Sequence, residues 1–434
     1  MAPKLVFLVD DILPSGRIVT ATDRLKEHHT NWQPNIYERV IDCYRKYCIN
    51  DVTFMPLREL NGKEPGVQYA YFVPMNDWHW TMQQIFFMID KETQKKLVDV
   101  NAFIYFCQDI EMYPNVRFPF LAEYLGIIKL FQEAHGHPNL KIGIGMCASL
   151  EQSQHQQIKD NFGDAIRLIH TPIMIPYSRD AIIEKYASQN LEFNPSAVFD
   201  EYIKSDKQRD FMCLSRDPKF SRIMFLHALR AYGLLDSGYV SNLMPSDIHV
   251  KFNNLDHEYI RNIDHDIRLG PIPRIEVDHI DEHHMINALA HNGTAGVLPF
   301  DHMRLSCYDI IQETTTRYDV SGILDQGVVT EKTVKSLMFG RPFMINGGPG
   351  VLNVIRNMGF KTCEYMFDEN YDNSLEMLSR HSAIIANALR WRGKRKEIMR
   401  RVNANISDLI HNLERVQNFP VEAELIKALV PVTQ

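Results

Sequence analysis

The sequence predicts an α/β protein in which two doubly wound, Rossmann-like domains face a cleft. The chain has 434 residues, a length typical of two or three domains. Short apolar runs alternate with amphipathic helical segments, and this rhythm starts twice along the chain. The apolar runs are rich in Val, Ile, Phe and Tyr, as in parallel sheets that are covered on both faces.

Composition narrows the function classes. The formal net charge is −7, from 47 Lys and Arg against 54 Asp and Glu, so the protein is not uniformly basic, although one basic groove stays compatible with this balance. No stretch reaches the roughly 18 apolar residues of a membrane helix, and the start of the chain is too short an apolar run for a signal peptide. We therefore expect a cytoplasmic protein. The seven cysteines form no Cys-x-x-Cys pair, which favours buried free thiols over a zinc ribbon or disulfides.

In the first half, the apolar runs predict strands at 5–9, 69–73, 102–107, 141–146 and 166–173, with a helix at 120–134. In the second half, strands are predicted at 211–214, 308–313 and 342–346, and helices at 221–232, 330–339 and 349–358. The stretch 184–207 is polar, and a helical pattern broken at Gly393 runs from 374 to about 413. The predicted domains are 1–185 and 208–373, joined by a linker at 186–207 and followed by a helical segment at 374–434.

The run Thr330-Glu-Lys332 predicts a helix N-terminus. Thr330 suits the N-cap, and Glu331 places a carboxylate in the first turn. Lys332 and Lys335 are three residues apart and share one helix face. Helix-end amides with lysine charge suit a diphosphate, and a carboxylate suits ribose or sugar hydroxyls. The same residues also fit a surface helix with a capping Thr and solvated lysines.

A longer pattern surrounds this helix. It comprises Glu313, Thr330-Glu-Lys332, Gly340-Arg-Pro-Phe343, Gly359-Phe-Lys-Thr362 and Asp368-Glu-Asn-Tyr-Asp372. In this order, the segments resemble the donor-binding region of the fucosyltransferase-like group of GT-B glycosyltransferases, which includes uncharacterised bacterial and viral (phage) members. Residues 211–222 and 225–229 look like the strand, Arg-containing turn and helix that open the donor domain of that group.

The resemblance implies that domain 208–373 binds a nucleotide sugar and that domain 1–185 binds the acceptor. The implied donor contacts are Arg216, Arg222, Glu313, Thr330, Glu331, Lys332 and Lys335. Fucosyltransferases usually place Asn and Ser after the acidic strand-end residue, whereas residues 314–316 are all Thr here. The nucleotide and the sugar therefore stay open, and both arginines also fit an ordinary surface role.

The expected activity is sugar transfer from a nucleotide-sugar donor to a hydroxyl acceptor, either a hydroxymethylated base in viral DNA or a glycan. No metal and no cofactor besides the donor is expected, because cationic side chains can neutralise a departing diphosphate. The alternative is a non-enzymatic protein that binds a nucleotide, a saccharide or nucleic acid. A dehydrogenase is disfavoured because no Gly-x-Gly-x-x-Gly follows the first strand. The oligomeric state stays open.

Transfer to a hydroxyl needs a general base. Asp109 and Glu111 follow the predicted strand at 102–107, and Asp10 follows the first strand. Each carboxylate is a candidate at a strand end, and each also suits a helix cap or a turn.

Three further groups bear on the acceptor or on a metal. Trp78 and Trp80 could stack on a sugar or a base, or be buried at a domain edge. The basic run at 390–401 contains Arg392, Lys394 and Arg395, which suit the phosphates of an acceptor DNA or an exposed helix face. His279 and His283 have the spacing of metal ligands on a helix, but an acidic, solvated helix start is favoured, so no metal site is predicted.

Overall fold

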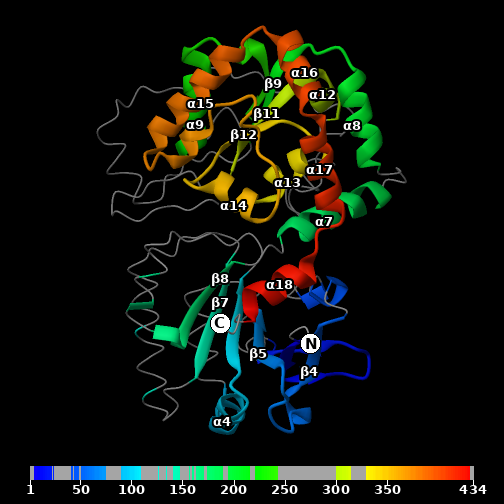
Figure 1. Ribbon diagram of the computed structural model, residues 1–434, viewed down its shortest axis with the longest axis vertical. Helices are drawn as coiled ribbons and strands as arrows, with labels where there is room; N and C mark the ends of the chain where they lie inside the picture. Colours follow the sequence, from blue (N-terminus) through cyan, green and yellow to red (C-terminus); the bar gives the residue numbers. More distant parts are fainter. Residues whose placement is uncertain are drawn as a thin grey trace. The chain divides into compact units, whose positions relative to one another are not determined.

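Two parallel β-sheets organise the chain in the computed structural model, one in each of two units (Figure 1). The first unit comprises residues 1–177 and 419–434, and the second comprises residues 178–418. The structure describes residues 4–21, 23, 41–42, 44–47, 50–74, 89–108, 126, 133, 140–146, 156, 159–160, 163–170, 174–188, 194–215, 220–242, 300–313 and 329–430.

The first unit contains a six-stranded sheet and a short hairpin. Its described elements are β1 (Lys4–Val9), β2 (Asp11–Ile12), β3 (Ile18–Val19), β4 (Val52–Pro56), η1 (Leu57–Glu59), β5 (Val67–Pro74), α4 (Lys91–Asp99), β6 (Phe103–Gln108), β7 (Lys141–Met146), η2 (Gly163–Ala165), β8 (Ile166–His170) and α18 (Val421–Leu429). Helix α7 (Met174–Ser188) follows β8 and extends into the second unit.

All neighbouring strands of the large sheet are parallel, in the order β4-β1-β5-β6-β7-β8. The chain adds β4 on one side of β1 and then continues with β5 on the other side. The topological switch point, where such sheets bind ligands beyond the carboxyl ends of their strands, therefore lies between β1 and β5.

Aromatic side chains fill the core of this unit. Phe7, Phe72 and Tyr105 lie on adjacent strands with ring centroids 5.0–6.1 Å apart. The buried hydroxyls of Tyr44 and Tyr105 share a hydrogen bond of 3.0 Å, so these rings bury large apolar areas without an unsatisfied hydroxyl.

Glu422 anchors the C-terminal helix α18 to the first unit. Its Oε1 accepts hydrogen bonds from the backbone amides of Asn50, Asp51 and Val52 at 2.8–2.9 Å, and its Oε2 accepts from Asn50 Nδ2 at 3.1 Å. Helix α18 also contacts β1 and β8. Partial burial raises the pKa of Glu422, but the hydrogen bonds from Asn50, Val52 and Asp51 outweigh it and leave the pKa below the ordinary 4.5.

This anchor predicts a pH dependence. Because the pKa of Glu422 is lower in the folded state, its stabilisation is fully present above about pH 4.5 and is lost as the pH falls through the folded-state pKa. In thermal unfolding, Glu422→Gln should lower the melting temperature at pH 7, and the difference from the native chain should shrink toward pH 3. Asp99→Asn, an exposed carboxylate of the same unit, is the control. A difference that does not change with pH would contradict this role of the carboxylate.

The second unit contains a four-stranded sheet and most of the helices. Its described elements are α8 (Pro195–Lys204), β9 (Arg209–Ser215), α9 (Phe220–Ala231), η3 (Leu235–Ser237), β10 (Gly238–Asn242), α12 (Phe300–Leu305), β11 (Ser306–Gln312), α13 (Glu331–Met338), β12 (Phe343–Asn346), α14 (Val351–Asn357), η5 (Glu369–Asn373), α15 (Met377–Trp391), α16 (Arg395–Ala404) and α17 (Ile406–Gln417).

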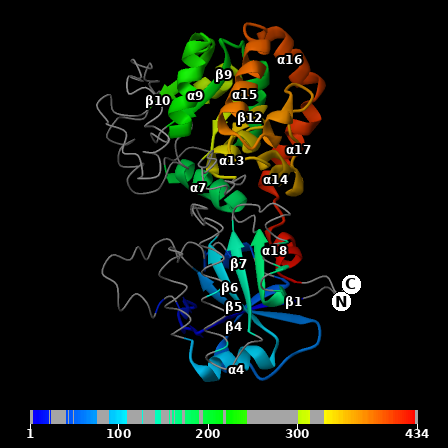
Figure 2. The same ribbon diagram turned by 90° about the vertical axis from the view of Figure 1, so that its left-hand side faces the viewer.

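The strand order is β10-β9-β11-β12, and all described neighbours are parallel. Helices cover both faces of the sheet, with α9 and α15 on one face and α8, α13 and α17 on the other (Figures 1 and 2). The chain places β10 on one side of β9 and β11 on the other, so the switch point lies between β9 and β11.

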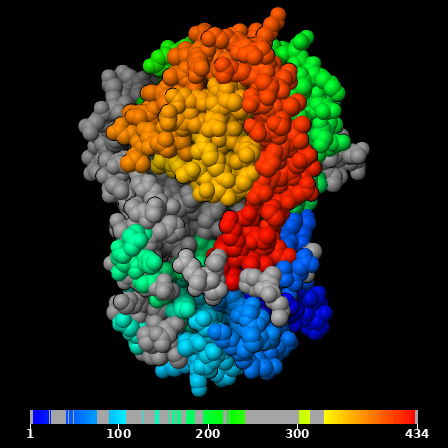
Figure 3. All heavy atoms as spheres, viewed as in Figure 1, coloured from blue at the N-terminus to red at the C-terminus, as the bar shows by residue number. Residues whose placement is uncertain are grey.

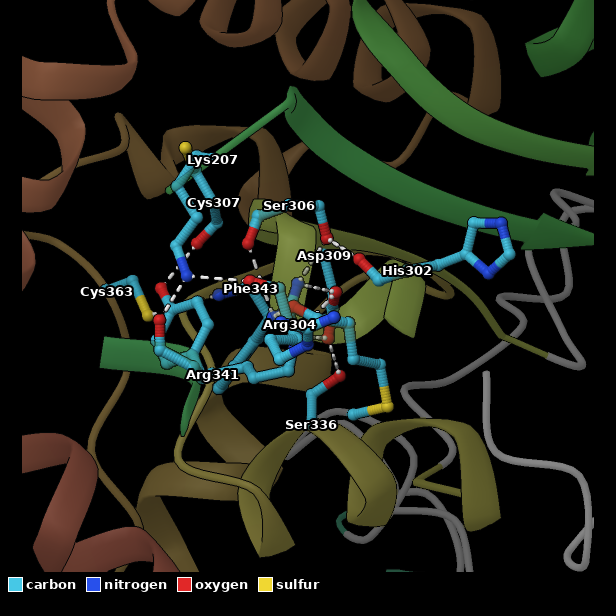
Figure 4. Close-up of polar contacts among 12 residues, drawn as sticks. Lys207, His302, Arg304, Ser306, Cys307, Asp309, Ser336, Arg341, Phe343 and Cys363 are labelled. Atoms are coloured by element: carbon cyan, nitrogen blue, oxygen red, sulfur yellow. Dashed lines mark hydrogen bonds and ion pairs between the residues drawn. The ribbon is translucent and has the colours of Figure 1, made fainter. Parts of the chain in front are cut away.

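A buried ion pair joins β11 to the segment between α13 and β12 (Figure 4). Nε of Arg341 lies 2.9 Å from both carboxylate oxygens of Asp309, and Nη2 donates to Oδ1 at 2.7 Å. Ser336 of α13 donates to Oδ2 at 2.8 Å, and Ser306 Oγ accepts from Arg341 Nη2 at 2.8 Å. Asp309 is thus fully engaged by three side-chain donors in a site where both charges are at most 3% exposed.

Helix α8 closes this network from outside. The guanidinium of Arg341 lies 4.9 Å from the ring centre of Tyr202, whose hydroxyl donates to the Cys307 carbonyl at 2.6 Å. Lys207 Nζ lies 3.9 Å from the same ring and donates to the Arg304 carbonyl at 2.8 Å. Burial lowers the pKa of Lys207 to about 7, with Arg341 adding to the effect.

The fold class is confirmed as α/β with parallel sheets. The stretch 186–207, predicted as a linker, carries α8 and lies inside the second unit. The four described cysteines are buried and unbonded, as expected for free thiols: Cys107, Cys213, Cys307 and Cys363. Within the described ranges, no helix combines the length and apolar character needed to span a membrane.

Removing one partner of the Arg341–Asp309 pair should destabilise the second unit strongly. Arg341→Met leaves a buried, uncompensated carboxylate, which costs about 3–5 kcal/mol in the free energy of unfolding. Urea denaturation measures this loss, with Lys96→Met in the exposed Lys96–Glu92 pair as the control that should change little. Adding Asp309→Asn to Arg341→Met should recover part of the loss. No recovery would mean that the arginine acts by packing alone.

Candidate functional site

The switch point of the second sheet brings together several residues that the sequence singled out. Glu313 directly follows β11, and Arg222 lies in the first turns of α9, which follows β9. Nη2 of Arg222 donates to the backbone carbonyl of Glu313 at 3.1 Å, and both residues are buried. This contact joins α9 to the residue that follows the carboxyl end of β11.

Glu313 fixes the N-terminus of α13. Its Oε1 accepts from the Thr330 amide at 3.0 Å and from Thr333 Oγ1 at 2.5 Å, and its Oε2 accepts from Thr330 Oγ1 at 2.6 Å. Thr330 Oγ1 accepts in turn from the Lys332 amide at 3.4 Å, as an N-cap does. Glu313 and Thr330 are at most 2% exposed. Both were predicted as donor contacts, and their hydrogen bonds make them residues that position the helix.

Lys332 carries charge toward solvent at this helix end. Its side chain is 24% exposed, and Nζ lies 2.7 Å from Glu331 Oε1 and 3.2 Å from Thr330 Oγ1. Glu331 is buried, and Lys335 is half-buried one turn further on. Burial lowers the pKa of Lys335 to about 8; the charge of Glu331 opposes this shift, and that of Lys332 adds to it. The first two turns of α13 thus combine a buried carboxylate with two lysines.

Two amide side chains at the same strand ends escaped the sequence analysis. Gln312 and Asn346 are paired residues of β11 and β12, and Asn346 Nδ2 donates to Gln312 Oε1 at 2.8 Å. Gln312 Nε2 in turn donates to Cys213 Sγ of β9 at 3.4 Å. Asn346 is fully buried, and its Oδ1 has no hydrogen-bond partner among the described residues. Each of these polar residues ends an apolar strand run, and this position could have predicted that they lie at the site.

The later motifs of the resemblance act as a structural brace. Glu369 accepts from the Cys363 amide at 2.7 Å and from Thr362 Oγ1 at 2.9 Å. Tyr371 Oη accepts from the Ile345 amide at 3.1 Å, and Asp372 Oδ2 accepts from the Leu352 amide at 2.9 Å at the start of α14. Burial raises the pKa of Asp372 to about 6, against the effect of these hydrogen bonds. These motifs hold β12 and α14 in place.

In the first unit, Asp10 lies directly after β1, at the switch point of that sheet. The hydroxyl of Tyr71, from the neighbouring strand β5, donates to Asp10 Oδ1. Asp10 is half-buried. The structure therefore places this candidate base at the strand end where ligands of such sheets bind.

Several predicted residues lie outside the described residues: Asp109, Glu111, Trp78, Trp80, Arg216, His279 and His283. In the described part of the chain, no group of three or more His, Cys, Asp or Glu side chains is arranged to hold a metal ion.

The basic residues Arg392, Lys394 and Arg395 lie at the other edge of the second sheet. Gly393, between them, donates its amide to Asp210 at 2.7 Å, and Arg395 is 3.4 Å from the same carboxylate. Asp210 is the second residue of β9, whereas Glu313 follows the carboxyl end of the neighbouring parallel strand β11. The length of the strands, about 20 Å for seven residues, therefore separates this cluster from α13's N-terminus.

The contacts of Glu313 predict a local effect of its removal. Glu313→Gln keeps the shape but sets an amide N–H₂ against threonine hydroxyls, which should cost about 1–3 kcal/mol. Hydrogen exchange should then become faster at the amides of Thr330 and Lys332. Glu364→Gln, an exposed carboxylate in the same unit, is the matched control. Unchanged exchange in Glu313→Gln would show that the carboxylate does not hold the helix end.

No model of a protein family matches this sequence, and no curated protein matches it.

Proposed function

We propose that the chain is a glycosyltransferase of the GT-B type, which binds a nucleotide sugar at the carboxyl edge of β9 and β11. The observation that carries this proposal is the Glu313 network. It sets the N-terminus of α13 at the switch point of the second sheet, beside the partly exposed cation of Lys332. Helix-end amides and a lysine at a switch point suit a nucleotide diphosphate.

In the proposed reaction, the bond between the anomeric carbon and the diphosphate oxygen breaks, and the electron pair stays on the diphosphate. The positive charges of Lys332 and Lys335 stabilise the negative charge that develops on the diphosphate, with Arg216 as a further predicted cation. The acceptor hydroxyl oxygen bonds to the anomeric carbon and loses its proton to a carboxylate. Asp10 is the described candidate for this base, and Asp109 and Glu111 are the other two. The acceptor is a hydroxymethylated DNA base or a glycan.

Calorimetric titration with a panel of nucleoside diphosphates tests the donor site. One nucleotide should bind, and Lys332→Gln should weaken its binding by about 10- to 100-fold, the value of one charge-assisted contact. Lys361→Gln, an exposed lysine of the same unit, should bind normally. Far-UV circular dichroism verifies that each variant is folded. Equal affinities for the native chain and for folded Lys332→Gln would refute this site.

Transfer separates an enzyme from a binding protein. Once titration has identified the nucleotide, the protein is incubated with the corresponding nucleotide sugar. The rate of nucleotide release should rise when a hydroxyl acceptor is added. Asp10→Asn still accepts a hydrogen bond from Tyr71, so donor affinity should persist while transfer falls if Asp10 is the base. Binding without release for any acceptor tested would favour the non-enzymatic alternative.

A further inference from the structure

Positive charge is concentrated in one short segment of an acidic protein. Residues 390–401 contain seven Lys and Arg against one Glu, a net charge of +6. The whole chain carries −7, so the other residues together carry −13. Such a contrast makes this segment the place where a polyanion would be attracted and the remaining surface the place where it would be repelled.

The fold holds this segment as a rigid corner between α15 and α16. Gly393, with φ +69°, makes the turn, and its amide donates to Asp210 at 2.7 Å. Trp391 is buried, and its Nε1 donates to the Met366 carbonyl at 2.9 Å. Arg390, Arg392, Lys394 and Lys396 are exposed around this anchored turn. Figure 3 shows α15 and α16 (orange) at the surface of the second unit.

The end of α9 extends the same surface. A Cβ atom built on Gly233 would lie 3.7 Å from Nη1 and Nη2 of Arg392, so the turn after α9 adjoins the corner. Arg230 and Tyr232 precede this turn; both are exposed, Tyr232 to 55%. We call the five cations Arg230, Arg390, Arg392, Lys394 and Lys396, together with Tyr232, the basic surface.

Two carboxylates beside the corner, Glu397 and Asp210, are paired with other cations. Glu397 pairs with Arg400 at 2.7 Å and with Arg401 at 3.4 Å, and Asp210 pairs with Arg395 at 3.4 Å. Within the ranges that the structure describes, none of the five cations of the basic surface forms an ion pair. Their charge is therefore available to an external partner.

The side chains favour nucleic acid over a membrane. Three of the five cations are arginines, and one planar guanidinium group can donate two parallel hydrogen bonds to a phosphate. An exposed tyrosine among cations can stack on an unpaired base. Binding to a bilayer interface instead uses a broad apolar face, whereas here Tyr232 and Leu389 are exposed but Trp391 is held in the core.

We propose that the basic surface binds the phosphate backbone of nucleic acid, as a docking surface separate from the site at α13. The separation follows from its place beside the amino end of β9, while Glu313 lies beyond the carboxyl end of β11. This docking does not depend on the proposed glycosyltransferase activity.

Fluorescence anisotropy with a short labelled DNA duplex tests the proposal in the full-length chain. If all five cations contact phosphates, affinity should fall by roughly 500-fold between about 50 and 200 mM salt. The triple variant Arg392→Ala, Lys394→Ala, Lys396→Ala keeps two cations and should lose only roughly 12-fold over the same range. Lys63→Ala, Lys91→Ala, Lys95→Ala removes the same charge from exposed positions of the first unit and should behave as the native chain.

Three results would overturn the proposal. The first is no binding of duplex or single-stranded DNA or RNA at low salt. The second is an equal loss of affinity in both triple variants, which would make net charge the cause. The third is binding to vesicles containing anionic lipid with no binding to nucleic acid. Nucleotide titration of the same variants should be normal, and this readout distinguishes failure of the docking surface from failure of the proposed donor site.

Discussion

The buried pair of Asp309 and Arg341 is the constraint on which the second unit depends. A carboxylate in the middle of a central strand is costly to bury unless it is paired and hydrogen-bonded. Arg341 and Ser336 supply that pairing only when α13 has returned along the face of β11 and the chain has turned at Gly340. The pair therefore specifies one register between the helix and the sheet, and α8 covers it through Tyr202.

A second buried carboxylate anchor, Glu313, lies four residues further on, directly after β11. Glu313 holds Thr330 and Thr333 of the incoming helix, while Asp309 holds Ser336 near its end. The strand and the helix run in opposite directions, so two anchors on each fix both position and tilt. As a consequence, the first turn of α13, with Lys332, is held at the switch point without help from a bound ligand.

The sequence patterns predicted the secondary-structure elements more accurately than they predicted the side-chain contacts. The helix predicted at 330–339 is α13 (Glu331–Met338), and the strand predicted at 342–346 is β12 (Phe343–Asn346), because apolar periodicity and capping are local signals. Strand β4 and helix α4 were not predicted. The inward role of Glu313 was also missed, since it depends on a threonine pair seventeen and twenty residues away. Likewise, nothing local to Glu422 indicates that α18 packs on the first unit, because its partners are about 370 residues away.

The balance of charged side chains differs between the carboxyl ends and the amino ends of the strands in the second sheet. At the carboxyl end of the strands, Lys332 pairs with the buried Glu331, whose charge also acts on Lys335, so the positive charge there is partly balanced. At the amino ends, Asp210 pairs with Arg395, and Glu397 pairs with Arg400 and Arg401. The other arginines and lysines there leave an excess of positive charge. A balanced site suits a small anion that needs orientation, whereas an excess of exposed cations suits a long polyanion that needs only attraction. The net charge of −7 conceals this difference, because it sums over two edges that the fold keeps apart.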